Sequence, residues 1–371
     1  MTQWQDIGAS DEFVENEPAA INVGGTSVAV FRLGDEVFAL HDLCTHGNAR
    51  LSDGYVEDGC VECPLHQGLF DIRNGAPRCA PVTEAVRSFP VRVVAGRVEV
   101  AVNNSPSTMG AEAQPHTVQQ YKGVVLAIER AAADVAIIKI MTDDLIPPVP
   151  YQAGQYIDIL LSEGQRRSYS MASAQGSRVL DLHIRHMPGG LFTDRVFTSL
   201  GVGDWLDLEG PHGRFFLRAS TAPVILLASG TGFAPIKAIV EAAIEHGNTR
   251  SMILYWGGRR PADIYLHQLC EQWSKAFAWF QFTPVLSDAM PDDHWTGRQG
   301  FVHQAVMQDH PDLSQHEVYA CGAPAMIDAA KRDFVELCRL KPDAFFADAF
   351  VSKADSKGSN KLDIAEYSVV S

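Results

Sequence analysis

The sequence predicts a multidomain α+β protein with three folded parts in series. Near the N-terminus, two pairs of short strand-like segments flank a loop-rich stretch, which predicts a small all-β domain. Short strands from Tyr121 onward predict an antiparallel β-barrel. Beyond residue 220, apolar strands alternate with helical stretches, and this alternation predicts an α/β domain with a parallel sheet.

Length and composition fit this division. At 371 residues the chain is too long for one small domain, and its 46% apolar content suits folded cores. No apolar run reaches membrane-spanning length, and the polar start MTQWQDIGASDEF is not a signal peptide, so we expect no membrane partner. The seven cysteines show no disulfide-framework spacing, which predicts a cytoplasmic protein.

The net charge of −15 argues against nucleic acid as a partner. Residues 1–102 hold fifteen carboxylates and seven arginines but no lysine, so more than half of the excess lies there. A solvated acidic face explains this charge, and so does electrostatic steering toward a basic redox partner. The sequence leaves both explanations open.

Residues 1–102 contain two predicted hairpins. The first is Thr26–Leu33 and Glu36–His41 around Gly34–Asp35; the second is Val91–Val94 and Arg97–Val102 around Ala95–Gly96. Between them lie two loops that each carry one cysteine and one histidine. We expect His41 and His116, which have no partner spacing, to be ordinary surface histidines.

The two loops present Cys44-Thr-His46 and, after sixteen residues, Cys63-Pro-Leu-His66. Two thiolates and two imidazoles are the ligand set of a Rieske 2Fe–2S centre, in which two histidines replace two cysteines on one iron. A structural zinc site is the alternative, since Cys2His2 also binds zinc. Zinc fingers usually pair like with like, whereas each loop here carries one ligand of each type. Cys60 forms a C-x-x-C pair with Cys63, but we expect it to pack as an apolar side chain.

Cys44-Thr-His-Gly and Cys63-Pro-Leu-His-Gln-Gly-Leu-Phe-Asp resemble the two cluster-binding loops of Rieske ferredoxins. Pro81 resembles the proline of the loop that covers the cluster in that family. Respiratory Rieske proteins carry an extra disulfide at positions that correspond here to Ala49 and Leu65. The resemblance is therefore to the low-potential ferredoxins of aromatic-ring dioxygenases, with potentials of roughly −150 mV.

Residues 103–116 lack periodicity and predict a linker, and residues 117–220 contain the predicted barrel. Its expected strands are Gly123–Ala127, Val135–Met141, Gln155–Leu161, Val179–His186 and Trp205–Glu209. The segment Arg167-Ser-Tyr169-Ser170 resembles the R-x-Y-[S/T] motif of the ferredoxin–NADP reductase superfamily. By that resemblance Arg167 pairs with an FAD phosphate, Tyr169 stacks on the flavin, and Ser170 bonds to the flavin N5 edge.

A second segment resembles the other flavin-binding stretch of that superfamily. It runs through His183, Ile184, Arg185, Gly189, Gly190 and Thr193. In the family, glycine-rich backbone amides and a hydroxyl at a helix start receive the FAD pyrophosphate. The turn Gly210-Pro-His-Gly213-Arg-Phe215 resembles the one that closes the flavin domain.

Residues 221–351 form the predicted α/β domain, with the apolar strand Val224–Ala228 at its start. A turn containing Gly230, Thr231, Gly232 and Pro235 follows, and then a helix to His246. Further strands are expected at Met252–Trp256, Phe280–Val285 and Val318–Ala320. The pattern G-x-G-x-x-P is the superfamily's version of the dinucleotide fingerprint, and an unliganded glycine-rich turn is the alternative.

Two further segments of this domain resemble the superfamily. Cys321-Gly322 follows a predicted strand and resembles the pair beside the nicotinamide, while Phe350 in FFADAF resembles the aromatic residue that shields the flavin. By this resemblance Ser170, Cys321 and Phe350 lie at the site of hydride transfer. Residues 352–371 are polar and predict a disordered tail.

These resemblances predict an NADH-dependent reductase that passes electrons through FAD and a Rieske 2Fe–2S cluster to a terminal oxygenase. FAD accepts two electrons as hydride and releases them singly, so it must lie between NADH and the cluster. A deoxysugar dehydrase is an alternative acceptor; a zinc-binding regulatory protein with a vestigial reductase fold is an alternative of another class. By the same resemblance, Ser287-Asp288 matches the Ser-Arg pair whose arginine binds the 2′-phosphate in NADPH-using members, so NADH is expected over NADPH. Arg259 and Arg260, which could receive a phosphate, are evidence for the opposite preference.

Overall fold

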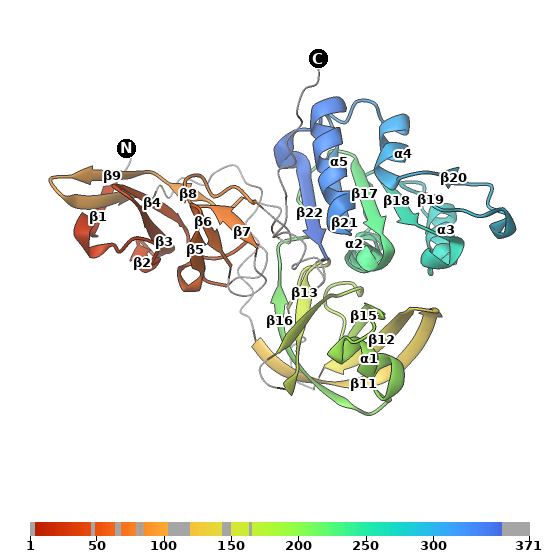
Figure 1. Cartoon of the computed structure of the whole chain (residues 1–371). Coiled ribbons are helices and arrows are strands. Elements are labelled where there is room, and N and C mark those ends of the chain that lie inside the picture. Colours follow the sequence, from red (N-terminus) through yellow and green to blue (C-terminus); the bar gives the residue numbers. More distant parts are fainter. Residues whose placement is uncertain are drawn as a thin grey trace, which may run out of the picture.

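The computed structural model describes residues 4–45, 49–63, 68–78, 82, 85–102, 119–142, 150–162 and 165–350. They form an N-terminal all-β lobe, a β-barrel and an α/β lobe (Figure 1). The predicted linker, the predicted tail, His46, His66, Pro81 and His116 lie outside the described residues. None of the helices in these ranges combines the length and the apolar character that membrane crossing requires.

The N-terminal lobe is built from ten short strands in three antiparallel sheets. They are β1 (Trp4–Ala9), β2 (Ala19–Val23), β3 (Thr26–Leu33), β4 (Glu36–His41), β5 (Tyr55–Glu57), β6 (Cys60–Glu62), β7 (Leu69–Asp71), β8 (Ser88–Phe89), β9 (Val91–Val94) and β10 (Arg97–Ala101). The sheet orders are β2-β3-β4-β8, β1-β10-β9 and β5-β6-β7. Both predicted hairpins are confirmed. Their turns use the left-handed backbone that tight hairpins need, with Gly34 at φ 62° and Ala95 at φ 50°.

The second lobe is one six-stranded antiparallel sheet that closes on itself. Its elements are β11 (Gln119–Ala132), β12 (Val135–Thr142), β13 (Tyr156–Leu160), β14 (Arg166–Ser170), β15 (Val179–Arg185), α1 (Leu191–Thr198) and β16 (Trp205–His212). The strand order is β14-β13-β16-β11-β12-β15. Met171, just beyond β14, forms a bridge with Leu182 of β15 and so joins the two edge strands. The predicted barrel is confirmed.

The third lobe is a parallel sheet with helices on both faces. Its strands are β17 (Val224–Ser229), β18 (Met252–Gly258), β19 (Phe280–Leu286), β20 (Arg298–Gln299), β21 (Glu317–Gly322) and β22 (Phe345–Ala349). Its helices are α2 (Phe233–Glu245), α3 (His267–Ala276), α4 (Val302–Asp309) and α5 (Pro324–Leu337). The order is β20-β19-β18-β17-β21-β22. One apolar core contains side chains of α2 and α3, and a second contains those of α4 and α5.

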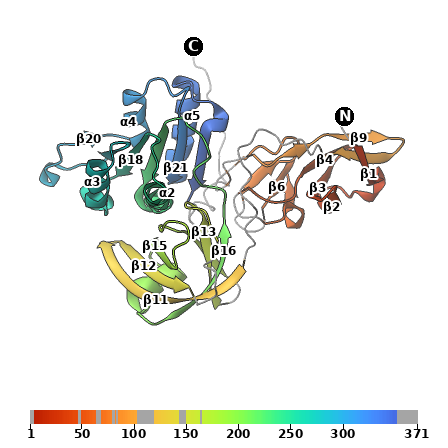
Figure 2. The same cartoon turned by 180° about the vertical axis from the view of Figure 1, so that it is seen from behind.

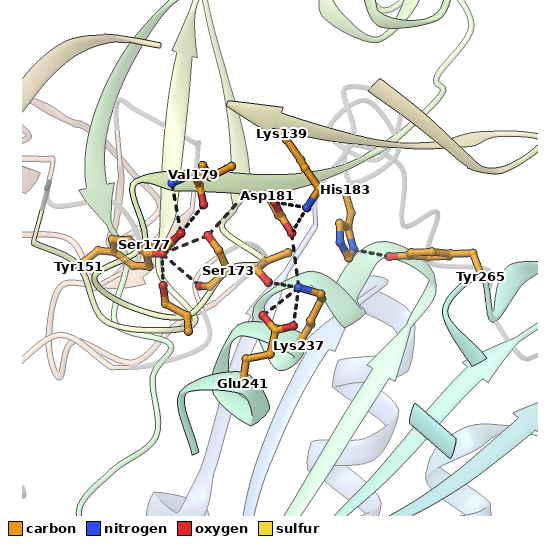
Figure 3. A network of polar contacts seen from close by, with 12 residues as sticks. Lys139, Tyr151, Ser173, Ser177, Val179, Asp181, His183, Lys237, Glu241 and Tyr265 are labelled. Carbon is orange, nitrogen blue, oxygen red and sulfur yellow. Dashed lines mark hydrogen bonds and ion pairs between the residues drawn. The ribbon is translucent and has the colours of Figure 1, made fainter. Parts of the chain in front are cut away.

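A buried lysine joins the barrel to the α/β lobe (Figure 3). Lys237 of α2 is only 8% exposed, and its Nζ donates to the Ala172 carbonyl at 2.9 Å. The same ammonium lies 2.8 Å from a Glu241 oxygen and 3.5 Å from Asp181 of β15. Two carboxylates and a carbonyl around one buried charge meet the condition under which burying a lysine is tolerated. This contact holds the start of α2 against the barrel.

A buried histidine forms another polar contact between these lobes. His183 Nδ1 of β15 lies 2.8 Å from the Tyr265 hydroxyl of the α/β lobe. Burial, reinforced by the charges of Lys237 and Lys139, lowers the pKa of His183 to about 3. The imidazole is therefore neutral in the folded protein over the physiological pH range. In an unfolded chain its pKa is about 6.5.

This difference makes the junction sensitive to acid. Between pH 6.5 and 3 the unfolded chain binds a proton that the folded chain does not, so the stabilisation is complete above about pH 6.5 and is lost as the pH falls. We expect the His183→Gln variant to lose about 1 kcal/mol less stability than the parent between about pH 7.5 and about pH 5.5. Thermal unfolding at the two pH values measures this. His267→Gln, at a histidine of α3 whose side chain is 34% exposed, is the control, and equal pH dependence of the His183 variant and the parent would contradict the assignment.

Candidate functional site

The two predicted cysteine ligands lie at the starts of two loops in the N-terminal lobe. Cys44 follows β4 and Cys63 follows β6, and each is 1% exposed. Both belong to the same buried apolar cluster. The Cys44 N–H donates to the Ala49 carbonyl at 2.8 Å, and the Cys63 N–H donates to the Gly68 carbonyl at 2.9 Å. Each bond joins two residues that flank one predicted histidine ligand in the sequence.

This donor set fits an iron–sulfur cluster. Two thiols from separate loops converge in an apolar setting, and each loop continues into a histidine that the sequence assigns as a ligand. Cys60 lies within β6, where it pairs with Asp71 of β7, and is partly buried. The ligand roles of Cys44, His46, Cys63 and His66 stay predictions.

The first flavin segment is strand β14. In its pairing with β13, Ser170 lies opposite Tyr156 and Tyr169 opposite Ile157. Tyr169 packs at a tilt on Phe192 of α1, with 5.4 Å between the ring centroids, and burial raises the pKa of its phenol. Tyr169 therefore offers a neutral aromatic face to a ligand.

The other two predicted flavin-binding residues of this strand, Ser170 and Arg167, differ in their surroundings. Ser170 is 5% exposed. Arg167 makes local contacts, to the Arg166 carbonyl at 2.6 Å and to Gln165 at 3.2 Å. Among the described residues, Arg167 has no ion pair with a carboxylate, so its charge is available to a phosphate.

The second flavin segment joins β15 to α1. Ile184 is buried in the barrel core, and Gly189 and Gly190 form the turn before the helix. The Thr193 hydroxyl donates to the Met187 carbonyl at 2.9 Å and accepts from its N–H at 3.2 Å. The Thr193 side chain therefore stabilises the turn that precedes α1, where the flavin site is predicted.

The structure places Arg185 between two predicted segments. The sequence assigns it to the flavin stretch, yet a Cβ built on Gly230 would lie 3.3 Å from its Nη2. Its Nε and Nη2 are buried with no hydrogen-bond partner among the described residues, and Asp134 and Asp263 lie at 3.6 and 3.8 Å. Unsatisfied buried donors cost about 1–3 kcal/mol each, so this guanidinium fits an anionic group beside Gly230.

The nucleotide turn is interlocked with the Cys321 segment. Gly230 has a φ of 54°, and Pro235 lies in the first turn of α2, as predicted. A Cβ on Gly232 would lie 2.2 Å from the Cys321 carbonyl oxygen, and one on Gly322 would lie 2.1 Å from the Ser229 hydroxyl. Contacts this close exclude any side chain at either position.

The Cys321 thiol is fully buried, and burial, with a smaller effect of Asp348, raises its pKa well above the usual value. It stays a neutral thiol and is not suited to nucleophilic chemistry. The Phe350 N–H donates to the Gly322 carbonyl at 2.9 Å. Phe350, Gly322 and the nucleotide turn therefore meet at the carboxyl ends of β17, β21 and β22, the edge at which ligands of open parallel sheets bind.

Sequence reasoning missed several residues of this region. Trp256 donates from Nε1 to the Gly230 carbonyl at 3.1 Å and stacks on Phe233 at 3.9 Å between centroids. Tyr265 bonds to His183. Trp256 is the last residue of a predicted strand. No spacing rule in the sequence connects it with the turn at Gly230, which follows the neighbouring strand. Nothing in the sequence could have indicated Tyr265.

Three family models match the chain in succession. The Rieske [2Fe-2S] domain matches residues 3–90, the oxidoreductase FAD-binding domain residues 122–217, and the oxidoreductase NAD-binding domain residues 226–332. The CDP-6-deoxy-L-threo-D-glycero-4-hexulose-3-dehydrase reductase of Yersinia pseudotuberculosis is 42% identical over 61% of this chain and 67% of its own length.

The chain belongs to the ferredoxin reductase family. This reductase also carries a Rieske domain. The anthranilate 1,2-dioxygenase ferredoxin subunit of Burkholderia cepacia is 67% identical over 28% of the chain and 94% of the subunit. Among solved structures, the Amycolatopsis cytochrome P450 reductase GcoB has a TM-score of 0.59 at 32% identity, over 66% of this chain and 73% of that one.

For this reductase we expect Tyr169→Ala to lose FAD and to retain iron. The aromatic face is worth about 1 kcal/mol beyond its buried area, so FAD should bind about tenfold more weakly or worse. The flavin-to-iron ratio after gel filtration measures this. Tyr55→Ala, at a 75% exposed tyrosine of the N-terminal lobe, is the control. Loss of iron with full retention of flavin would refute the assignment of Tyr169.

Proposed function

We propose that this reductase supplies electrons from NADH to the terminal oxygenase of an aromatic-ring dioxygenase system. FAD, when bound, supplies the conversion of a two-electron donor into single electrons that a 2Fe–2S cluster accepts. The single observation that carries the proposal is the 67% identity of its cluster lobe to nearly the whole ferredoxin subunit of an anthranilate dioxygenase. An acceptor protein contacts the last carrier in the chain, so this lobe is more informative about the acceptor than the flavin lobe.

The chain's own residues bind and orient the cofactors and exclude water from them. Tyr169 presents a neutral ring, Arg167 and Arg185 offer guanidinium groups to phosphates, and the turn at Gly230 and Gly232 admits a dinucleotide backbone. Cys321, buried and neutral, packs at the nicotinamide position without taking a proton. The acidic cluster lobe would steer toward a basic face of the oxygenase. A cytoplasmic location fits the need for NADH.

A deoxysugar dehydrase is the second candidate acceptor, favoured by the 42% identity to a dehydrase reductase. Reconstitution distinguishes the two. Purified reductase with iron and flavin should support NADH-dependent dihydroxylation when mixed with an aromatic-ring oxygenase component. It should not support reduction by a 3-dehydrase. The opposite pattern would reject the proposal, and a colourless protein that contains zinc would reject the redox function altogether.

Arg259 and Arg260 are the two arginines that could bind the 2′-phosphate of NADPH. Their contacts with carboxylates support a preference for NADH. Arg260 makes a two-pronged pair with Asp293, at 2.6 and 2.7 Å, and Arg259 pairs with Asp263 at 3.2 Å. The Asp288 N–H donates to the Arg259 carbonyl at 3.1 Å, and its exposed carboxylate adds to the effect of the paired carboxylates in raising the pKa of both arginines. To bind either arginine, the 2′-phosphate of NADPH would have to displace the carboxylate paired with it and approach the carboxylate of Asp288.

We therefore expect an Asp288→Asn, Asp293→Asn double variant to use NADPH more efficiently than the parent does. Freeing Arg260 and removing one repelling charge should raise kcat/KM for NADPH about tenfold or more relative to NADH. Steady-state reduction of ferricyanide compares the two nucleotides. Asp292→Asn removes one charge from the same turn and is the matched control. A parent enzyme that already prefers NADPH would show that the arginines outweigh Asp288.

A further inference from the structure

The cluster lobe lies against the flavin barrel at the ends of β13 and β16, as the two opposite views show (Figures 1 and 2). Burial raises the pKa of the Tyr156 phenol of β13 well above its usual value, and nearby negative charges add to this. The carboxylates of Asp158 and Asp348 contribute most of this effect, and the sulfurs of Cys44 and Cys63 add to it. Together with the position of the cluster lobe at the ends of β13 and β16, this puts Tyr156 on the side of the barrel that faces the lobe of Cys44 and Cys63.

A second pair of groups marks the same contact. The Arg214 guanidinium, two residues beyond β16, is close enough to His41 to reinforce the effect of burial in lowering the imidazole pKa. His41 ends β4, three residues before Cys44, and its Nδ1 accepts the Leu43 N–H at 3.4 Å. The expectation that His41 is an ordinary surface histidine is wrong, because the histidine is partly buried near the barrel.

Tyr156 occupies the position between the flavin segment and the cluster cysteines. Its backbone pairs with Ser170 on one side and with His212 on the other. The rings of Tyr156 and His212 lie 5.4 Å apart between centroids, with an interplanar angle of 31°. Both residues are nearly inaccessible, at 4% and 3% exposure. This tilted ring pair therefore lies on the side of β14, the strand of Tyr169 and Ser170, that faces the lobe of Cys44 and Cys63.

A charged network of Asp158, Glu209 and Arg166 lies beside His212. Its Nε2 lies 3.7 Å from an Asp158 oxygen and 3.8 Å from a Glu209 oxygen. Asp158 is fully buried and accepts the Ser168 hydroxyl at 2.6 Å. These three groups could hold a cation, but Arg166 already bonds to Glu209 and lies 3.8 Å from Asp158. We read the network as an anchor for the imidazole.

The nicotinamide side of the site reaches the same tyrosine. Asp348 of β22 lies opposite Cys321 of β21, and its carboxylate acts on both the Cys321 thiol and the Tyr156 phenol. Asp348 is 6% exposed. The predicted positions of nicotinamide, flavin and cluster thus adjoin one buried residue, Tyr156.

We propose that the contact of the cluster loops with Tyr156 and His212 is the geometry in which electrons pass from flavin to cluster within one chain. The two residues position the donor and the acceptor. This inference rests on the proposed function. Bound FAD would take the hydride from NADH and would give up its two electrons one after the other, with one proton released to solvent. A bound cluster would accept one electron at a time, with one of its two ferric ions reduced to ferrous, and would pass that electron to the acceptor protein before it takes the second.

Rapid mixing with NADH under anaerobic conditions, followed at flavin and cluster wavelengths, tests the proposal in the intact protein. In Tyr156→Leu, cluster reduction should slow about tenfold or more, because a small misplacement of reacting groups is costly. Tyr156→Phe keeps the ring and should restore the rate. Tyr121→Leu removes another buried barrel tyrosine, 6% exposed, and should leave the rate near that of the parent. Flavin and iron content and the cluster spectrum are recorded for every variant.

A Tyr156→Leu rate equal to the parent's, or an equal slowing in Tyr121→Leu, would overturn the proposal. If Tyr156→Leu fails to fold, the rates of cluster reduction in Arg214→Glu and in the parent protein test the proposal instead. The charge reversal should slow cluster reduction while the flavin-to-iron ratio holds, and an unchanged rate counts against the contact. In the parent, a rate independent of viscosity supports transfer in the docked state, and a viscosity-limited rate contradicts it. Failure of the proposed function is distinguishable, because the sample would then lack flavin or iron.

Discussion

The double pairing of strand β13 is the constraint on which the arrangement depends. β13 is hydrogen-bonded to β14 on one side and to β16 on the other, so its first residue, Tyr156, has Ser170 and His212 as fixed neighbours. Because side chains alternate along strands, this register decides which residues face the flavin segment and which are buried with Asp158. A one-residue slip of β13 would carry the tyrosine away from the cluster lobe and bring the Asp158 carboxylate out of its network.

Buried ionisable groups hold the lobes together. Lys237 meets Asp181 and Glu241 between the barrel and the α/β lobe, and His183 remains neutral beside Tyr265. Such groups are weak contributors to net stability because their desolvation is costly, but they admit few alternative geometries. Their value here is to fix the angle at which the nucleotide turn faces the flavin strand.

Much of the fold was predictable from the sequence because its signals are local. The turn at Gly34–Asp35 follows from local turn chemistry and the parallel strand at Val224 from an unbroken apolar run; both are confirmed. The junction was not predictable. Tyr156 and His212 are separated by more than fifty residues, and nothing in their spacing indicates that their rings meet. Arg185 fitted a flavin motif, and only the folded chain places its guanidinium beside Gly230.

The interlocked glycines limit how this protein can be recombined with its relatives. Gly232 fits against the Cys321 carbonyl and Gly322 against Ser229, so each turn is shaped by the other although about ninety residues separate them. A chimera with its crossover point between β17 and β21 would combine turns from two parents, and a mismatch of a few tenths of an ångström would have no side chain to absorb it. Exchange of nucleotide specificity between homologues is therefore best achieved by transplanting the whole α/β lobe or by substituting individual side chains within it.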